Sequence, residues 1–115
     1  MNQERRRYPR HETEFGARIY TDDLDLSVTV VDINDRGINI ISKRPIGTGS
    51  KVLISLFPIS KDPIMGIPIW SFRIKRDQKY FYRTGIEIEN LHLEKIQALG
   101  LPKRSKFVSE ILFQT

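Results

Sequence analysis

The sequence contains no cysteine and only two histidines. Without cysteine the chain cannot form a disulfide bond or a thiolate metal site. No apolar run approaches the ~18–20 residues that a membrane-spanning helix needs, and residues 1–12 lack the apolar segment of a secretory signal. We therefore expect a cytoplasmic protein that is stabilised by its own hydrophobic core.

Residues that perform catalysis are also scarce. The sequence has no nucleophile elbow and no spacing of metal ligands, which argues against an enzyme. Asp22, Asp23 and Asp25 lie close together, but their spacing does not match a calcium loop, so we interpret them as a solvated turn. Gly47 and Gly49 lack the lysine of a phosphate-binding loop. We predict that the protein is not an enzyme, holds no metal and needs no cofactor.

The net charge of +5 is concentrated at the two ends of the chain. Residues 1–12 hold four arginines and two glutamates, and near the other end Lys103, Arg104 and Lys106 outnumber Glu110. The middle of the chain is nearly balanced. Basic ends on a neutral body suggest an anionic partner, and simple solvated tails are the alternative.

The pattern of apolar residues predicts a mainly β fold. A length of 115 residues corresponds to one domain. Trp70, Phe72 and Ile74 share one face of their strand, and we expect Trp70 in the core rather than exposed as a stacking platform. Ile86 and Ile88 alternate with Glu87, which indicates one buried face. Short strands with tight turns favour a small antiparallel barrel or sandwich, and we expect about six, at residues 15–20, 27–31, 38–41, 51–57, 67–74 and 80–89.

Two helical segments are expected after the last strand. Asn90 is suited to cap a helix over residues 91–99, which Gly100 and Pro102 would end. Residues 107–113 form a second amphipathic segment, too apolar for a free tail. This second segment either plugs one end of a barrel or forms an interaction surface.

The stretch from Asp32 to Gly37 lies between two apolar runs and predicts a hairpin. Gly37 suits a turn position with positive φ. Because side chains alternate along a strand, Asp32 and Asn34 would share the outer surface if Ile33 enters the core. An adjacent carboxylate and amide could read the neighbouring N1 and N2 donors of guanine. Alternatively, Asn34 and Asp35 only form hydrogen bonds to the backbone of the turn.

The N-terminal arm provides a second candidate for ligand binding. Pro9 disfavours a helix, and in an extended chain Arg6 and Arg10 lie on the same side, roughly 13 Å apart at ~3.3 Å per residue. Two guanidinium groups on such an arm can bind phosphates bidentately and stack on bases. Arg7 faces the other way and is a further candidate, and His11 could stack on a base. A general polybasic tail would need no particular spacing.

Arm and hairpin together resemble the PilZ domain, the bacterial receptor for cyclic di-GMP. Arg6 and Arg10 match the arginine pair of that family, and Asp32 and Gly37 match its hairpin motif, with Asn34 in place of a serine. The resemblance covers roughly residues 4–100. It implies a six-stranded antiparallel barrel with a C-terminal helix, an arm that closes over the ligand and a hairpin that reads guanine. We expect an arm over residues 1–12, a barrel with its helix over 13–100 and an amphipathic segment over 101–115.

The favoured interpretation is a cyclic di-GMP receptor or adaptor in bacterial second-messenger signalling. Its expected ligand contacts are Arg6, Arg7, Arg10, Asp32, Asn34 and Gly37, and it would signal through a protein partner that the sequence does not identify. One alternative is a PilZ-like interaction domain that has lost nucleotide binding. A less favoured alternative is a barrel that binds single-stranded nucleic acid with its basic arm and exposed Tyr80, Phe81 and Tyr82.

Overall fold

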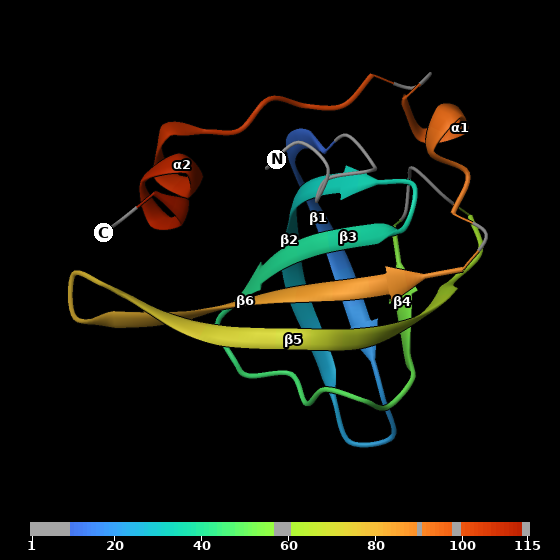
Figure 1. Ribbon diagram of the computed structural model, residues 1–115. Coiled ribbons are helices and arrows are strands. Elements are labelled where there is room, and N and C mark those ends of the chain that lie inside the picture. Colours follow the sequence, from blue (N-terminus) through green and yellow to red (C-terminus); the bar gives the residue numbers. More distant parts are fainter. Residues whose placement is uncertain (1–9, 57–60, 90, 98–99, 114–115) are drawn as a thin grey trace, which may run out of the picture.

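A computed structural model describes residues 10–56, 61–89, 91–97 and 100–113 (Figure 1). All strand pairs are antiparallel, and the sheet closes on itself as a barrel in the order β1-β2-β3-β6-β5-β4. The prediction of a mainly β fold with six antiparallel strands is therefore confirmed. The elements are β1 (His11–Tyr20), β2 (Asp25–Asn34), β3 (Gly37–Ser42), β4 (Val52–Ser55), β5 (Ile64–Arg76), β6 (Lys79–Ile88), α1 (Leu93–Gln97) and α2 (Lys106–Leu112).

Aliphatic side chains fill the inside of the barrel. Alternation along the strands directs every second residue inward, which is why Ile86 and Ile88 are buried while Glu87 between them is exposed. Ile33 is completely buried, which is the condition under which Asp32 and Asn34 were expected to share the outer surface. The inner cluster consists mainly of β-branched residues from five strands: Ile19, Val28, Val30, Ile33, Ile38, Ile40, Val52, Ile54, Ile86 and Ile88. Ile64 of β5 packs against it.

The region of α1 adds to this inner core. Leu91 and Ile96 are buried among the barrel residues, and α1 lies near one end of the barrel (Figure 1). Helix α1 begins at Leu93 within the predicted range 91–99, and the predicted cap Asn90 and residues 98–99 lie outside the described residues.

The second helix, α2, lies on the outside of the barrel rather than in its end (Figure 1). Val108 and Ile111 pack against Val31, Ile41 and Phe81, which form a second buried cluster. Phe81 is only 6% exposed, so the prediction that it is an exposed aromatic is wrong, because α2 covers it.

Two irregularities in the sheet explain how the segment before α2 attaches. The β1–β2 register shifts between Glu12 and Phe15, and the β2–β3 register shifts between Val30 and Asp32. Such bulges free backbone groups from the ladder. At the first, the Glu14 N–H donates to the carbonyl oxygen of Pro102 at 3.2 Å. At the second, the Arg104 side chain donates twice to the carbonyl oxygen of Val31, at 2.9 and 2.7 Å.

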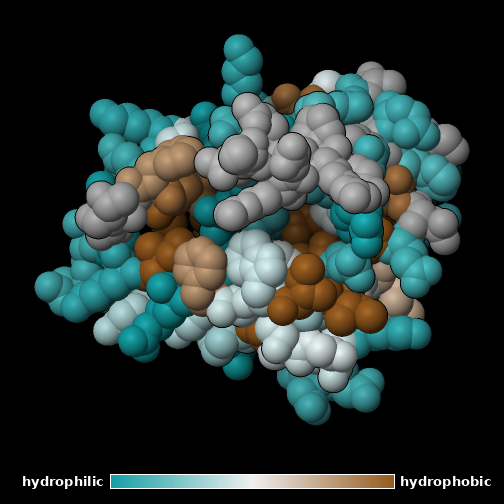
Figure 2. All heavy atoms as spheres, in the orientation of Figure 1, coloured by the Kyte–Doolittle hydropathy of each residue, from teal (hydrophilic) through white to brown (hydrophobic). Residues whose placement is uncertain are grey.

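Trp70 is on the outer face of β5, so the prediction that it belongs to the core is wrong. The β5–β6 register shifts between Pro68 and Trp70, which turns both Ile69 and Trp70 outward. Trp70 is 37% exposed and stacks on Phe72 with ring centroids 5.5 Å apart. Figure 2 shows tan and brown side chains on the side of the molecule where β5 and β6 run.

Candidate functional site

The site is built around the carboxylate of Asp32, near the end of β2. Its side chain is 2% exposed, and three arginines approach the same oxygen, Oδ2. Arg10, just before β1, is 3.8 Å away; Arg83 of β6 and Arg104 of the C-terminal segment are each 3.4 Å away. Segments distant in the sequence therefore converge on one acidic group.

Asp32 is more buried than the sequence indicated. We expected it on the outer surface beside Asn34, and the bulge at Val31 does turn it away from the core that holds Ile33. Arg104, whose side chain is 7% exposed, covers it together with Arg83. A buried carboxylate requires such partners, because removing an isolated charge from water is costly.

The cluster retains positive charge. Arg104 also pairs with Glu12 at 3.2 Å, so the three arginines face two carboxylates. The pKa of Arg83 is lowered, chiefly by burial and further by the positive charges of Arg10 and Arg104, while Asp32 opposes this shift. A guanidinium remains charged in spite of such shifts. An anion bound beside Arg83 would therefore offset an unfavourable concentration of like charge.

The same place holds buried polar atoms that have no hydrogen-bond partner among the described residues. They are Asp32 Oδ1, Asn39 Oδ1 and Arg83 Nε. Asp32 pairs with Asn39 across β2 and β3, and Arg83 bonds to the other oxygen of Asp32. Buried polar groups are nearly always satisfied, so such a concentration indicates a position for water or a ligand.

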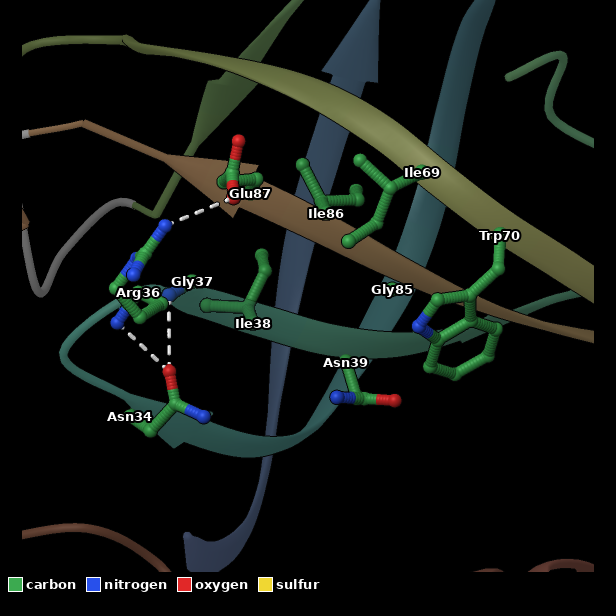
Figure 3. Close-up of a pocket in the computed structure, with 10 residues that line it drawn as sticks. All are labelled: Asn34, Arg36, Gly37, Ile38, Asn39, Ile69, Trp70, Gly85, Ile86 and Glu87. Carbon is green, nitrogen blue, oxygen red and sulfur yellow. Dashed lines mark hydrogen bonds and ion pairs between the residues drawn. The ribbon is translucent and has the colours of Figure 1, made fainter. Parts of the chain in front are cut away.

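Asn34 forms the hairpin turn with its side chain. Its Oδ1 accepts hydrogen bonds from the backbone N–H of Arg36 at 2.7 Å and of Gly37 at 3.0 Å (Figure 3). The interpretation of Asn34 as a turn residue is therefore confirmed. These bonds use the acceptor of the amide, and its two N–H donors lie on the other atom, Nδ2.

Gly37 is required for a different reason from the predicted one. Its φ is not positive; among the described glycines only Gly49 and Gly100 have positive φ. A β-carbon at Gly37 would instead collide with the backbone carbonyl of Ile86 on β6. The glycine thus allows β3 and β6 to approach closely beside the turn.

A shallow pocket of about 150 Å³ lies beside the hairpin (Figure 3). Asn39, Gly85 and Trp70 are neighbours in one cross-strand row, and Asp32 continues this row on β2. The indole of Trp70 lies over Gly85, where a β-carbon would collide with the ring. The pocket is lined by Asn34, Arg36, Gly37, Ile38, Asn39, Ile69, Trp70, Gly85, Ile86 and Glu87. It therefore combines an aromatic wall with amide groups and the Arg36–Glu87 ion pair of 3.2 Å.

The structure brings some of the predicted site residues together. Arg10 meets Asp32, and Asn34 and Gly37 line the adjacent pocket. Arg6 and Arg7 lie outside the described residues. His11 is directed to helix α1, with its Nε2 3.1 Å from Nε2 of Gln97.

The sequence reasoning missed Asn39, Arg83 and Arg104 as site residues and misplaced Trp70. Asn39 is a polar residue between two inward isoleucines of β3, so strand alternation alone could have placed it on the same outer face as Asp32. Arg83 and Arg104 carried no local signal, because the pairing of β3 with β6 and the path of the C-terminal segment bring them to Asp32.

The sequence pattern of the PilZ domain matches residues 4–100, most of the chain. The chain belongs to the PilZ domain family. PilZ domains are receptor or adaptor modules and not enzymes, so the prediction of a non-enzyme is confirmed. No curated protein sequence matches this PilZ chain.

Solved structures share the fold at low sequence identity. The PilZ domain with c-di-GMP of YcgR from Escherichia coli has a TM-score of 0.61 and 14% identity, and covers 83% of this chain and 86% of its own. The MrkH–c-di-GMP complex of K. pneumonia has a TM-score of 0.61 and 16% identity, and the match covers 95% of this chain and 53% of the MrkH chain. The Bacillus subtilis inhibitor of motility MotI/DgrA has a TM-score of 0.59 and 15% identity, and the match covers 82% of this chain and 47% of the MotI/DgrA chain. The chain thus spans about half the length of the last two proteins.

In the part of the chain that the structure describes, neither helix has the length and apolar character required to cross a bilayer.

Proposed function

We propose that this PilZ domain is a receptor for cyclic di-GMP. The observation that supports this most directly is the convergence of Arg10, Arg83 and Arg104 on Asp32, beside a pocket with an aromatic wall. Two solved structures of similar fold, from YcgR and MrkH, contain c-di-GMP. A ligand with two phosphates and two planar bases matches the charge and shape of this region.

The phosphates match the excess positive charge. Guanidinium groups bind phosphate through short, charge-assisted and often bidentate hydrogen bonds. Arg10 is the best placed of the described arginines, because its side chain is 37% exposed and its contact with Asp32, at 3.8 Å, is long. We propose that Arg6 and Arg7 of the arm join Arg10 on the ligand, and that the arm changes conformation when the ligand binds.

A guanine base matches the polar groups beside the hairpin. Asp32 Oδ1 is an acceptor without a described partner, as a guanine with adjacent N–H donors requires. The Nδ2 group of Asn34 provides hydrogen-bond donors for the base, and Asn34 and Gly37 both line the adjacent pocket. Trp70 offers a flat apolar wall on which a base can stack, a contact worth ~1–3 kcal/mol in other nucleotide-binding proteins.

We also propose that this receptor signals through a protein partner. The outer face of β5 provides a surface for such contacts, since Met65, Ile69 and Phe72 are each at least half exposed, at 50%, 56% and 51%. Exposed apolar patches of this kind mark interaction sites. The same observation favours the second candidate function, an interaction domain without a nucleotide.

The test is calorimetric titration of the full chain with cyclic di-GMP, beside Asp32→Asn as a variant of nearly equal shape. We expect binding by the wild type and at least a tenfold loss in the variant, with circular dichroism confirming that both are folded. Cyclic di-AMP and a short single-stranded oligonucleotide serve as competitors. If cyclic di-GMP does not bind, the interaction-domain function replaces this one. Oligonucleotide binding that falls steeply with salt would instead indicate a nucleic-acid-binding barrel.

A further inference from the structure

The C-terminal segment, residues 101–112, is attached to the barrel at the ligand site proposed above. The Thr13 hydroxyl, completely buried, donates to the Pro102 carbonyl oxygen at 2.6 Å. The Ser105 N–H donates to Glu14 Oε1 at 2.6 Å. Between these two anchors, Arg104 reaches down to Asp32.

Arg104 is held more firmly by other groups than by Asp32. It donates to the Val31 carbonyl oxygen at 2.9 and 2.7 Å and pairs with Glu12 at 3.2 Å, whereas its contact with Asp32 Oδ2 is 3.4 Å. A ligand that approaches Asp32 therefore has no need to displace Arg104. The contact instead fixes one carboxylate oxygen, and the other, Oδ1, has no partner among the described residues.

We propose that Arg104 is a positioning residue for Asp32, and that the C-terminal segment is therefore part of the ligand site. Arg104 orients the carboxylate so that Oδ1 faces the guanine, and its charge supports the binding of an anion. This inference rests on the proposed receptor function and deepens it.

Docking of the C-terminal segment and binding of the ligand affect each other reciprocally. If docking of the C-terminal segment favours ligand binding, the ligand must favour docking of the segment by the same factor. Helix α2 forms the second half of this segment and packs against Val31, the residue whose carbonyl oxygen accepts the hydrogen bonds of Arg104. Ligand binding should thus tighten α2 against the barrel, which gives the receptor a way to change the surface it presents to a partner.

The first test compares Arg104→Gln with Lys103→Gln and Lys106→Gln, which remove the same charge from exposed neighbours. We expect Arg104→Gln to weaken cyclic di-GMP binding roughly 10- to 100-fold, the effect of one charge-assisted hydrogen bond. The two controls should stay within about twofold of the wild type. Wild-type affinity in Arg104→Gln overturns the inference, and so does tighter binding, which would make Arg104 a competitor of the ligand.

Thr13→Val loosens the segment without touching Arg104 or the ligand. It removes the hydroxyl bond to Pro102, whose carbonyl oxygen keeps its bond from the Glu14 N–H. We expect about a threefold loss of affinity, about half the effect of one net hydrogen bond. This variant also decides the question if Arg104→Gln does not fold, because unchanged affinity in Thr13→Val contradicts a role for the docked segment.

Hydrogen exchange of the wild-type protein tests the coupling directly. If Arg104 only stabilised the fold, ligand binding would not change exchange in the C-terminal segment. We expect cyclic di-GMP to slow exchange at the amides of Ser105 and Val108, which bond to Glu14 and to the helix cap. Faster or unchanged exchange with bound ligand overturns the coupling. The proposed function fails differently, since the wild type itself would then show no binding to cyclic di-GMP.

Discussion

The indole of Trp70 lies over Gly85, its partner on the neighbouring strand, where a β-carbon would collide with the ring. The glycine therefore determines where the aromatic wall of the pocket stands. Trp70 is the only tryptophan of the chain, so its fluorescence reports on this wall alone.

Gly85→Ala should displace the ring and shift the tryptophan emission. We expect the affinity for cyclic di-GMP to fall about tenfold, within the ~1–3 kcal/mol that a stacked aromatic contributes. Gly16→Ala is the control, because a β-carbon at Gly16 meets no atom within 4 Å. Unchanged emission and affinity in Gly85→Ala would show that the ring is not held against the glycine.

Asn34→Ser replaces the amide by the smaller hydroxyl found in the family motif. Serine can accept a hydrogen bond from the turn backbone as the Asn34 Oδ1 does, and it leaves more room for a base. We expect the variant to bind cyclic di-GMP about fivefold more tightly, a gain of ~1 kcal/mol. Calorimetry of both proteins measures the difference, and weaker binding would show that the Nδ2 donors of Asn34 contribute more to affinity than the added room does.

Arg10→Ala should weaken ligand binding and leave the fold intact. The side chain is partly exposed and its 3.8 Å contact with Asp32 is long, so its loss should change the free energy of unfolding by less than ~1 kcal/mol. Affinity should fall roughly 10- to 100-fold.

The control for Arg10→Ala is Arg18→Ala, which removes an exposed arginine bonded to Asp25 at 2.6 Å. Titration of both variants separates a specific contact from general attraction. An equal loss in the two variants would indicate that only the net charge of the protein matters.

Asp32→Ala should destabilise the protein as well as abolish binding. Arg83 and Arg104 would lose a buried partner, and breaking a buried ion pair from one side costs about 3 kcal/mol. Urea denaturation measures this loss, and Asp35→Ala in the exposed turn is the control. A wild-type denaturation midpoint in Asp32→Ala would mean that the three arginines are already solvated without the carboxylate.

Gly37→Ala should be strongly destabilising, because the added carbon would collide with the rigid backbone of Ile86. We expect a loss of more than about 2 kcal/mol in the free energy of unfolding, typical of severe overpacking. Gly47→Ala, where a β-carbon meets no atom within 4 Å, should be nearly neutral. Similar melting temperatures for the two variants would contradict the close approach of β3 and β6.

Local patterns in the sequence determined the strands and the turns between them. Alternation identified Ile86 and Ile88 as core residues, and each is 2% exposed. The hairpin motif located Asp32 and Asn34. These features depend on neighbours along the chain, which is why the sequence by itself determines them.

The tertiary structure decided what surrounds those residues. Trp70 faces outward because a bulge at Ile69 changes the register of β5, and Gly37 is needed because β6 passes close to it. Arg83 and Arg104 reach Asp32 from 51 and 72 residues away in the sequence. No local pattern records which strands pair or where a segment docks, because those contacts depend on the closure of the whole barrel.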